Sequence, residues 1–295
     1  MTGIIPLKKE ENMTSFLAVK RVRGIVGEKK CGHTGTLDPM ATGVLPVALG
    51  GATRFIELLP THKKAYKAIF RLGLVTDTLD IWGTVTEETG KTASFDEVLK
   101  ILPQFTGKIK QVPPMYSALK KDGVRLYELA RQGVEVEREE RECEIFVLEV
   151  EELSENEFSF YTECSSGTYI RSLIYDIGEA LGTGAVMTSL NRTFACGISE
   201  SECITLQELE NFKDNNELEK VIIPVDKILS EYPKINVTKP QGVRFKNGGE
   251  LLKNRLKGEV PFGLIRVYCD NEFLGLGEIL PESENLTVKR VYVER

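Results

Sequence analysis

The amino-acid sequence predicts an α/β (α+β) fold with a small β-barrel at its C-terminal end. Strand-like and helix-like segments mix along most of the 295 residues, and no internal repeat is present. The stretch 224–240 is punctuated by Pro224, Pro233 and Pro240 and predicts a boundary. Beyond it, short strand-like segments alternate with turn residues such as Asp270 and Asn271, which is typical of a small barrel.

The periodicity of apolar residues predicts the individual elements. A helix is expected over residues 15–26, with Thr14 or Ser15 as its N-cap. Its inward face should carry four apolar side chains: Phe16, Val19, Val22 and Val26. Two more helices are expected over 95–102 and 169–181, the second closed by Gly182. Strands are expected over 3–7, 44–49, 65–74, 144–150, 157–164, 263–269, 272–280 and 286–293.

The composition is that of an ordinary globular protein, with 41% apolar and 28% charged residues. No apolar stretch approaches the ~18 residues of a membrane span, and the first residues do not resemble a signal peptide. We therefore expect a cytoplasmic protein without a membrane partner. The net charge of −6 argues mildly against nucleic acid, but lysines and arginines are bunched around residues 20–30, 63–71 and 108–125. These clusters predict either a basic face or ordinary solvated surface.

Cysteine and histidine content excludes several kinds of chemistry. The six cysteines form no Cys-x-x-Cys pair, and only His33 and His62 are available as histidine ligands or bases. A Cys/His zinc site or a histidine-rich metal centre is therefore not expected. The cysteines are interpreted as reduced structural thiols.

Glycines and prolines are densest between Gly32 and Pro46, in the run Gly-His-Thr-Gly-Thr-Leu-Asp-Pro-Met-Ala-Thr-Gly-Val-Leu-Pro. Such a run predicts a shaped loop that presents His33 and Asp38, because Pro39 keeps Asp38 out of helical geometry. It is not a phosphate-binding P-loop, since no Gly-Lys-Ser/Thr follows. From the spacing alone, a purely structural turn remains the alternative.

Four blocks in order resemble the TruB family of pseudouridine synthases, and they span residues 3 to about 195. The first is the His-x-Gly-x-Leu-Asp-Pro loop with Ala41-Thr42-Gly43. The second block consists of Ala65-Tyr66-Lys67, Leu72-Gly73 and Thr76-Asp77-Thr78-x-Asp80. The third extends from Val112 to Lys120 and on to Gly133, and the fourth extends from Cys164 to Arg171. The resemblance implies a mainly antiparallel extended sheet flanked by helices, with a PUA-like C-terminal barrel.

The resemblance also implies catalytic roles. Asp38 matches the family's catalytic aspartate, which acts either as a nucleophile or by removing a proton from the sugar, without a cofactor. Arg171 matches the arginine that pairs with it and favours its ionised form.

Substrate-binding roles follow in the same way. Tyr66 matches a tyrosine that stacks on the flipped uracil and belongs to the catalytic set, and nearby lysines can meet phosphates. Tyr169 and Leu190 match pocket residues, and His33 matches a histidine beside the extruded base. His62 matches nothing and is expected at the surface.

The block over 107–140 is of the stand-alone bacterial type and implies an insertion that closes over RNA. The expected domains are 1–232, catalytic, and 234–295, PUA-like. The implied substrate is uridine 55 in the T-arm of tRNA, with no obligate protein partner. A tRNA-folding helper, a synthase for another RNA and an acidic protein-interaction module remain open alternatives.

Two stretches depart from the family pattern. Residues 9–12 are Lys-Glu-Glu-Asn where the family has Lys-Pro-x-Gly. Because the proline and the glycine are missing, we expect the geometry of that turn to differ from the family's. Leu79 and Trp82 stand where small or polar residues are usual.

Overall fold

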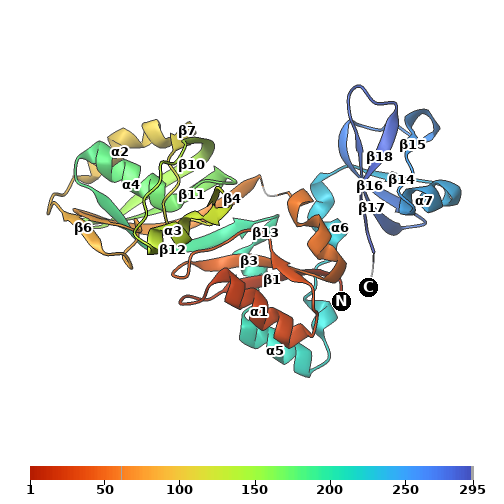
Figure 1. Ribbon diagram of the computed structural model, residues 1–295, viewed down its shortest axis with the longest axis horizontal. Helices are drawn as coiled ribbons and strands as arrows, with labels where there is room; N and C mark the ends of the chain where they lie inside the picture. The colour runs from red at the N-terminus through yellow and green to blue at the C-terminus, as the bar shows by residue number, and fades with distance from the viewer. Residues whose placement is uncertain (61, 294–295) are drawn as a thin grey trace.

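The computed structural model describes residues 1–60 and 62–293 and confirms an α+β fold (Figure 1). A large mixed sheet forms the body, and helices cover it. A second, curled sheet lies at the opposite end of the molecule from β6. The α-helices are α1 (Ser15–Val26), α2 (Phe95–Ile101), α3 (Leu126–Arg131), α4 (Ile170–Leu181), α5 (Leu206–Asp214), α6 (Val225–Ile228) and α7 (Lys239–Lys246).

The large sheet has the order β1-β3-β12-β4-β11-β10-β7, with β2 paired to β3 and β13 paired to β12. All of its pairings are antiparallel except β12 with β3, which run parallel where Asn191 meets Thr42. Its strands are β1 (Gly3–Lys9), β2 (Cys31–His33), β3 (Thr42–Leu49), β4 (Lys63–Leu72), β7 (Gly107–Gln111), β10 (Arg141–Ser154), β11 (Glu157–Ser165), β12 (Ala185–Ala195) and β13 (Ile198–Ser199).

The predicted barrel is present as a curled five-stranded half-barrel in the order β14-β16-β17-β18-β15. Asp270 and Asn271 both have positive φ and make the turn between β16 and β17. The strands are β14 (Lys234–Asn236), β15 (Leu251–Leu252), β16 (Gly263–Cys269), β17 (Glu272–Ile279) and β18 (Asn285–Val291). Small two-stranded pairs are formed by β5 (Leu74–Thr76) with β6 (Val85–Glu88) and by β8 (Lys120–Lys121) with β9 (Val124–Arg125).

The half-barrel packs on the body through an aromatic cluster. The Phe55 ring lies 6.1 Å from that of Phe273 and 6.3 Å from that of Tyr292, centroid to centroid. The same cluster contains residues of β1 and β3, such as Ile4 and Val44. Burial of this apolar area holds the C-terminal sheet against the edge of the large sheet.

The inward face predicted for α1 is partly wrong. Phe16 is 76% exposed, and the buried face is centred on Ala18, Val22 and Ile25. At about 100° per residue, Phe16 points well away from the centre of this face. Thr14 is the N-cap, because its hydroxyl accepts the Leu17 N–H at 3.1 Å.

Other boundaries differ for identifiable reasons. Gly73, with φ +85°, ends β4 at Leu72. Helix α2 stops at Ile101 and tightens into a 3-10 turn containing Pro103. Gly182 closes α4 in the left-handed conformation as expected. Helix α7 was not predicted, since Pro240 and Gly242 interrupt its apolar pattern.

The stretch 9–12, which departs from the family pattern, contains a turn at Glu11 and Asn12. Asn12 adopts φ +60°, the left-handed conformation that the family's glycine would supply. Asparagine tolerates this region better than other non-glycine residues.

Helix α4, which carries Arg171, also contains a carboxyl group with a raised pKa. Burial, and then the charge of Glu179, raise the pKa of Asp176 to about 6. Its folded pKa lies above the unfolded value of about 3.9, so the stability linked to its proton is present at low pH and lost as the pH rises through about 6. Asp176→Asn should therefore raise the free energy of unfolding by about 1–2 kcal/mol at pH 8. Urea denaturation at pH 8 and pH 4 measures it.

At pH 4 the variant and the parent should be nearly equal in stability, because the parent carboxyl is then protonated. A stability difference that is the same at both pH values would contradict the assignment.

Candidate active site

Five of the six predicted site residues line one cavity of about 300 Å³ at the centre of the large sheet. Asp38 comes from the loop before β3, Tyr66 from β4 and Leu190 from β12, while Tyr169 and Arg171 lie at the start of α4. His33 lies on β2 and is not among the lining residues. His62 is exposed, as predicted.

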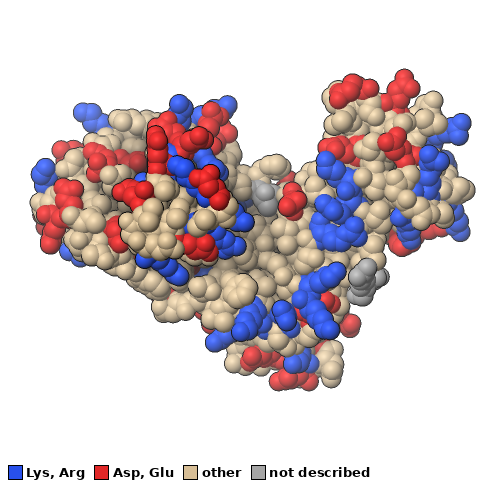
Figure 2. Space-filling model, in the orientation of Figure 1, with Lys and Arg blue, Asp and Glu red and all other residues tan. Residues whose placement is uncertain are grey.

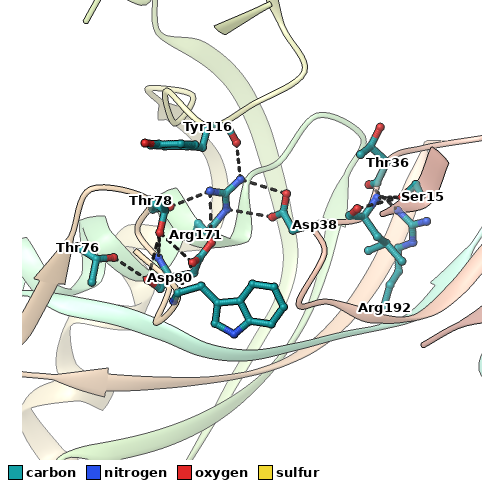
Figure 3. Close-up of polar contacts among 11 residues, drawn as sticks. Ser15, Thr36, Asp38, Thr76, Thr78, Asp80, Tyr116, Arg171 and Arg192 are labelled. Atoms are coloured by element: carbon teal, nitrogen blue, oxygen red, sulfur yellow. Dashed lines mark hydrogen bonds and ion pairs between the residues drawn. The ribbon is translucent and has the colours of Figure 1, made fainter. Parts of the chain in front are cut away.

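Asp38 and Arg171 form a two-pronged ion pair (Figure 3). The distance from Arg171 Nε to Asp38 Oδ2 is 3.0 Å, and that from Nη2 to Oδ1 is 3.2 Å. The Arg171 side chain is only 5% exposed, whereas that of Asp38 is 32% exposed. The arginine is thus a buried support, and the carboxylate faces the cavity.

Three further acceptors fix the Arg171 guanidinium. It donates to the carbonyl oxygens of Thr78 and Tyr116, each at 2.7 Å. Its Nη1 also lies 3.5 Å from Oδ2 of Asp80, a largely buried carboxylate. Burial raises the pKa of Asp80, and the Arg171 charge opposes that rise. Asp80 stands in the second sequence block, but its contact with Arg171 was not predicted.

The loop that carries Asp38 is held by three buried polar side chains from other elements. Ser15 Oγ accepts the Leu37 N–H at 2.8 Å and donates to the Leu37 carbonyl at 3.0 Å. Arg192 donates to the carbonyls of Gly35, Thr36 and Val44. Figure 3 shows Ser15, Thr36 and Arg192 on the far side of Asp38 from Arg171.

Lys9 is the third of these side chains. It donates to the carbonyls of Glu10 at 2.7 Å and Pro39 at 3.2 Å. Burial is the largest influence on Lys9 and lowers its pKa to about 8, although the nearby Asp38 carboxylate opposes the shift. None of these clamps was predicted, since a serine or lysine at an element terminus is usually solvated.

Two tyrosines, Tyr66 and Tyr169, line the cavity. Tyr66 is 6% exposed, and burial raises its pKa and that of Tyr169, so both phenols are neutral at pH 7. The buried side chain of Gln111 forms two hydrogen bonds with the Tyr169 backbone. It accepts one from the Tyr169 N–H at 3.1 Å and donates one to the Tyr169 carbonyl at 3.3 Å. Burial, and then the Arg192 charge, lower the pKa of His33, which favours its neutral form.

In the view of Figure 2, lysine and arginine side chains border much of the hollow between the body and the C-terminal half-barrel, whereas basic and acidic side chains are mixed over the outer surfaces. This arrangement favours the basic-face interpretation of the charge clusters. Within residues 1–60 and 62–293, no helix is long and apolar enough to cross a membrane. Over the same ranges, no group of three His, Cys, Asp or Glu side chains is placed to hold a metal ion.

The cavity presents an arginine-paired aspartate beside Tyr66 and Tyr169 on a mainly antiparallel sheet, the arrangement that the resemblance to pseudouridine synthases implies. Family models agree with this class. The N-terminal domain of TruB family pseudouridylate synthases matches residues 23–170, and the tRNA pseudouridylate synthase B C-terminal domain matches 171–230. The C-terminal domain of pseudouridine synthase II TruB matches 233–291. The chain therefore belongs to the TruB family of pseudouridine synthases.

The chain is similar to curated relatives that share one name, tRNA pseudouridine synthase B, and it matches them over nearly their whole length. The chain is 47% identical to tRNA pseudouridine synthase B of Clostridium perfringens over 283 residues, 94% of this chain and 95% of that protein. It is 43% identical to the protein of the same name from Clostridium tetani, over 94% of this chain and 96% of that protein.

Solved structures share the fold. A chain of a Cbf5-Nop10-Gar1 complex superposes with a TM-score of 0.77 at 28% identity, covering 99% of this chain and 85% of that one. A chain of an H/ACA RNP bound to a substrate RNA containing 2′-deoxyuridine gives 0.75 at 26% identity, covering 99% and 86%.

The Ser15 clamp is testable by deletion of its hydroxyl. Ser15→Ala leaves the buried N–H and carbonyl of Leu37 without their partner, so the free energy of unfolding should fall by about 1–3 kcal/mol. Urea denaturation measures the loss. Ser230→Ala is a matched control, since Ser230 is exposed, and it should change stability by less than about 0.5 kcal/mol. Equal stabilities of the two variants would refute the clamp.

Proposed function

We propose that the chain is a tRNA pseudouridine synthase that isomerises uridine 55 in the T-arm. The observation that carries the proposal is the Asp38 carboxylate, held by Arg171 at the edge of a cavity large enough for one base. The names of the relatives in the two Clostridium species support tRNA as the substrate.

The reaction replaces the N1–C1′ glycosidic bond of the target uridine with a C5–C1′ bond. The bond between N1 of uracil and C1′ of the ribose breaks, the base turns, and C5 bonds to C1′; the C5 proton is lost and N1 gains one. Asp38 serves the step at the sugar, either by attacking C1′ or by removing a sugar proton. Arg171 orients the carboxylate, because its guanidinium bonds both oxygens.

The target uridine must leave its stack to reach Asp38. Tyr66 then offers an aromatic face that replaces part of the lost stacking, while Tyr169 and Leu190 close the sides of the cavity. His33, beside the loop, is assigned to the RNA near the extruded base. As isomerisation exchanges no electrons with another molecule, the proposal includes no cofactor.

The rest of the chain is assigned to holding the RNA. Residues 1–232 form the proposed catalytic domain, and its segment 107–140 is the proposed clamp over the RNA. Residues 234–295 form the proposed PUA-like domain. The T-arm would be recognised mainly by shape and backbone contacts, which suits folded RNA. A cytoplasmic location and the absence of an obligate protein partner belong to the same proposal.

Asp38→Asn is the direct test of the proposal. The variant keeps the shape of the side chain but loses its charge, so pseudouridine formation should fall by at least about 1000-fold. Affinity for tRNA should stay within about threefold. Carbodiimide labelling with primer extension on unmodified tRNA locates the product, expected at position 55.

Asp214→Asn, at an exposed aspartate of α5, is the control and should match the parent. Product at another position, or only on another RNA, would refute the substrate assignment. Tight tRNA binding without any product by the parent would instead favour a tRNA-folding role.

A further inference from the structure

The three lysines around Tyr66 have different surroundings. Side chains alternate between the two faces of a strand, so Lys64 shares its face with Tyr66, and Lys63 and Lys67 point the other way. Lys63 is exposed and forms an ion pair with Glu163. Lys67 is exposed. Lys64 alone of the three lines the cavity that contains Asp38, and it is partly buried.

The Lys64 ammonium has no partner of its own. Within residues 1–60 and 62–293 it makes no hydrogen bond and no ion pair. Burial, and then the positive charge of Arg192, lower its pKa. A cation that is partly removed from water and has no partner in the protein costs free energy.

The surroundings of Lys64 are positive rather than neutral. A Cβ placed on Gly35 would lie 3.4 Å from Lys64 Nζ and 3.6 Å from Arg192 Nη1, so two cationic groups border the same small space. Arg192 donates only to carbonyl oxygens in the bonds described above. The neighbouring thiols of Cys164 and Cys196 have pKa values raised by burial and stay neutral.

Lys64 borders both this space and the cavity that contains Asp38. Thr36, Gly167 and Thr168 line the same cavity, and at Gly35 there is no side chain to fill the gap before Lys64. An anion that entered the cavity would give Lys64 the partner that the protein does not supply. A uracil base is uncharged, whereas the RNA backbone carries one negative charge per phosphate.

We propose that Lys64 is a phosphate-binding residue of the active site, which holds a backbone phosphate adjoining the flipped nucleotide. The inference rests on the proposed function and deepens it by assigning the backbone contact that draws the nucleotide into the cavity. Lys64 contacts the substrate but not the bond that breaks, so it acts on affinity more than on the chemical step.

Lys64→Met tests the proposal in the full-length protein with a T-arm hairpin as substrate. The Kd for the hairpin should rise about 10- to 100-fold, the rate at saturation should stay within about threefold, and the slope of log Kd against log salt should fall by about one. Lys64→Arg should restore most of the affinity, because it keeps the charge. Lys63→Met removes a neighbouring lysine that is already paired, and its Kd should stay within about twofold.

A chemical change in the RNA identifies the partner. Hairpins with a single methylphosphonate, which is neutral, are made at each phosphate flanking the target. At one position, the methylphosphonate should weaken binding by the parent as much as the Lys64→Met substitution weakens binding of the unmodified hairpin. The same methylphosphonate should not weaken binding by Lys64→Met any further. Additive losses at every position, or an unchanged Kd for Lys64→Met, would overturn the proposal.

The experiment distinguishes failure of the proposed function from failure of the Lys64 assignment. If the parent forms no pseudouridine in this hairpin or in tRNA, the enzymatic assignment fails, whatever the methylphosphonate series shows. If the parent is active and Lys64→Met binds and reacts as the parent does, only the phosphate assignment fails.

Discussion

The buried guanidinium of Arg171 is the contact on which the rest of the site depends. It binds two carboxylates and two backbone carbonyls, and these come from the Asp38 loop, from the turn that contains Thr78 and Asp80, and from Tyr116 in the 107–140 segment. A charge so buried is stable only while its partners stay in place. Three segments distant in sequence are therefore fixed relative to one another by a single side chain, and the same contact orients the carboxylate that faces the cavity.

The Asp38 loop is held equally firmly on its other side. Ser15, Lys9 and Arg192 bond its backbone from α1, β1 and β12. Preorganisation of this kind lowers the barrier to a reaction because little reordering is needed when substrate binds. The chain has a net charge of −6, yet the side chains of Lys64 and Arg171 line the cavity beside Asp38. Local placement of charge, rather than the total, suits the site to an RNA backbone.

The family resemblance predicted five residues that the structure brings together. Asp38, Tyr66, Tyr169, Arg171 and Leu190 come together in one cavity, and helix α4 ends at Gly182 as its spacing predicts. The supporting side chains were not predicted. The contact between Asp80 and Arg171 joins residues 91 positions apart, and nothing in the pattern around Ser15 or Arg192 distinguishes a buried clamp from a solvated polar residue. Likewise, Phe16 was placed inside because hydrophobicity alone does not show which face of α1 meets the sheet.

Arg171→Lys tests the central role of the guanidinium most directly, because lysine keeps the charge but does not bond both carboxylate oxygens and two carbonyls at once. The measurement is the single-turnover rate of pseudouridine formation on tRNA, together with Kd and a near-UV circular dichroism spectrum to establish folding. The account predicts a folded variant whose rate falls at least about 100-fold while Kd stays within about threefold. A folded variant that reacts at the parental rate would contradict it.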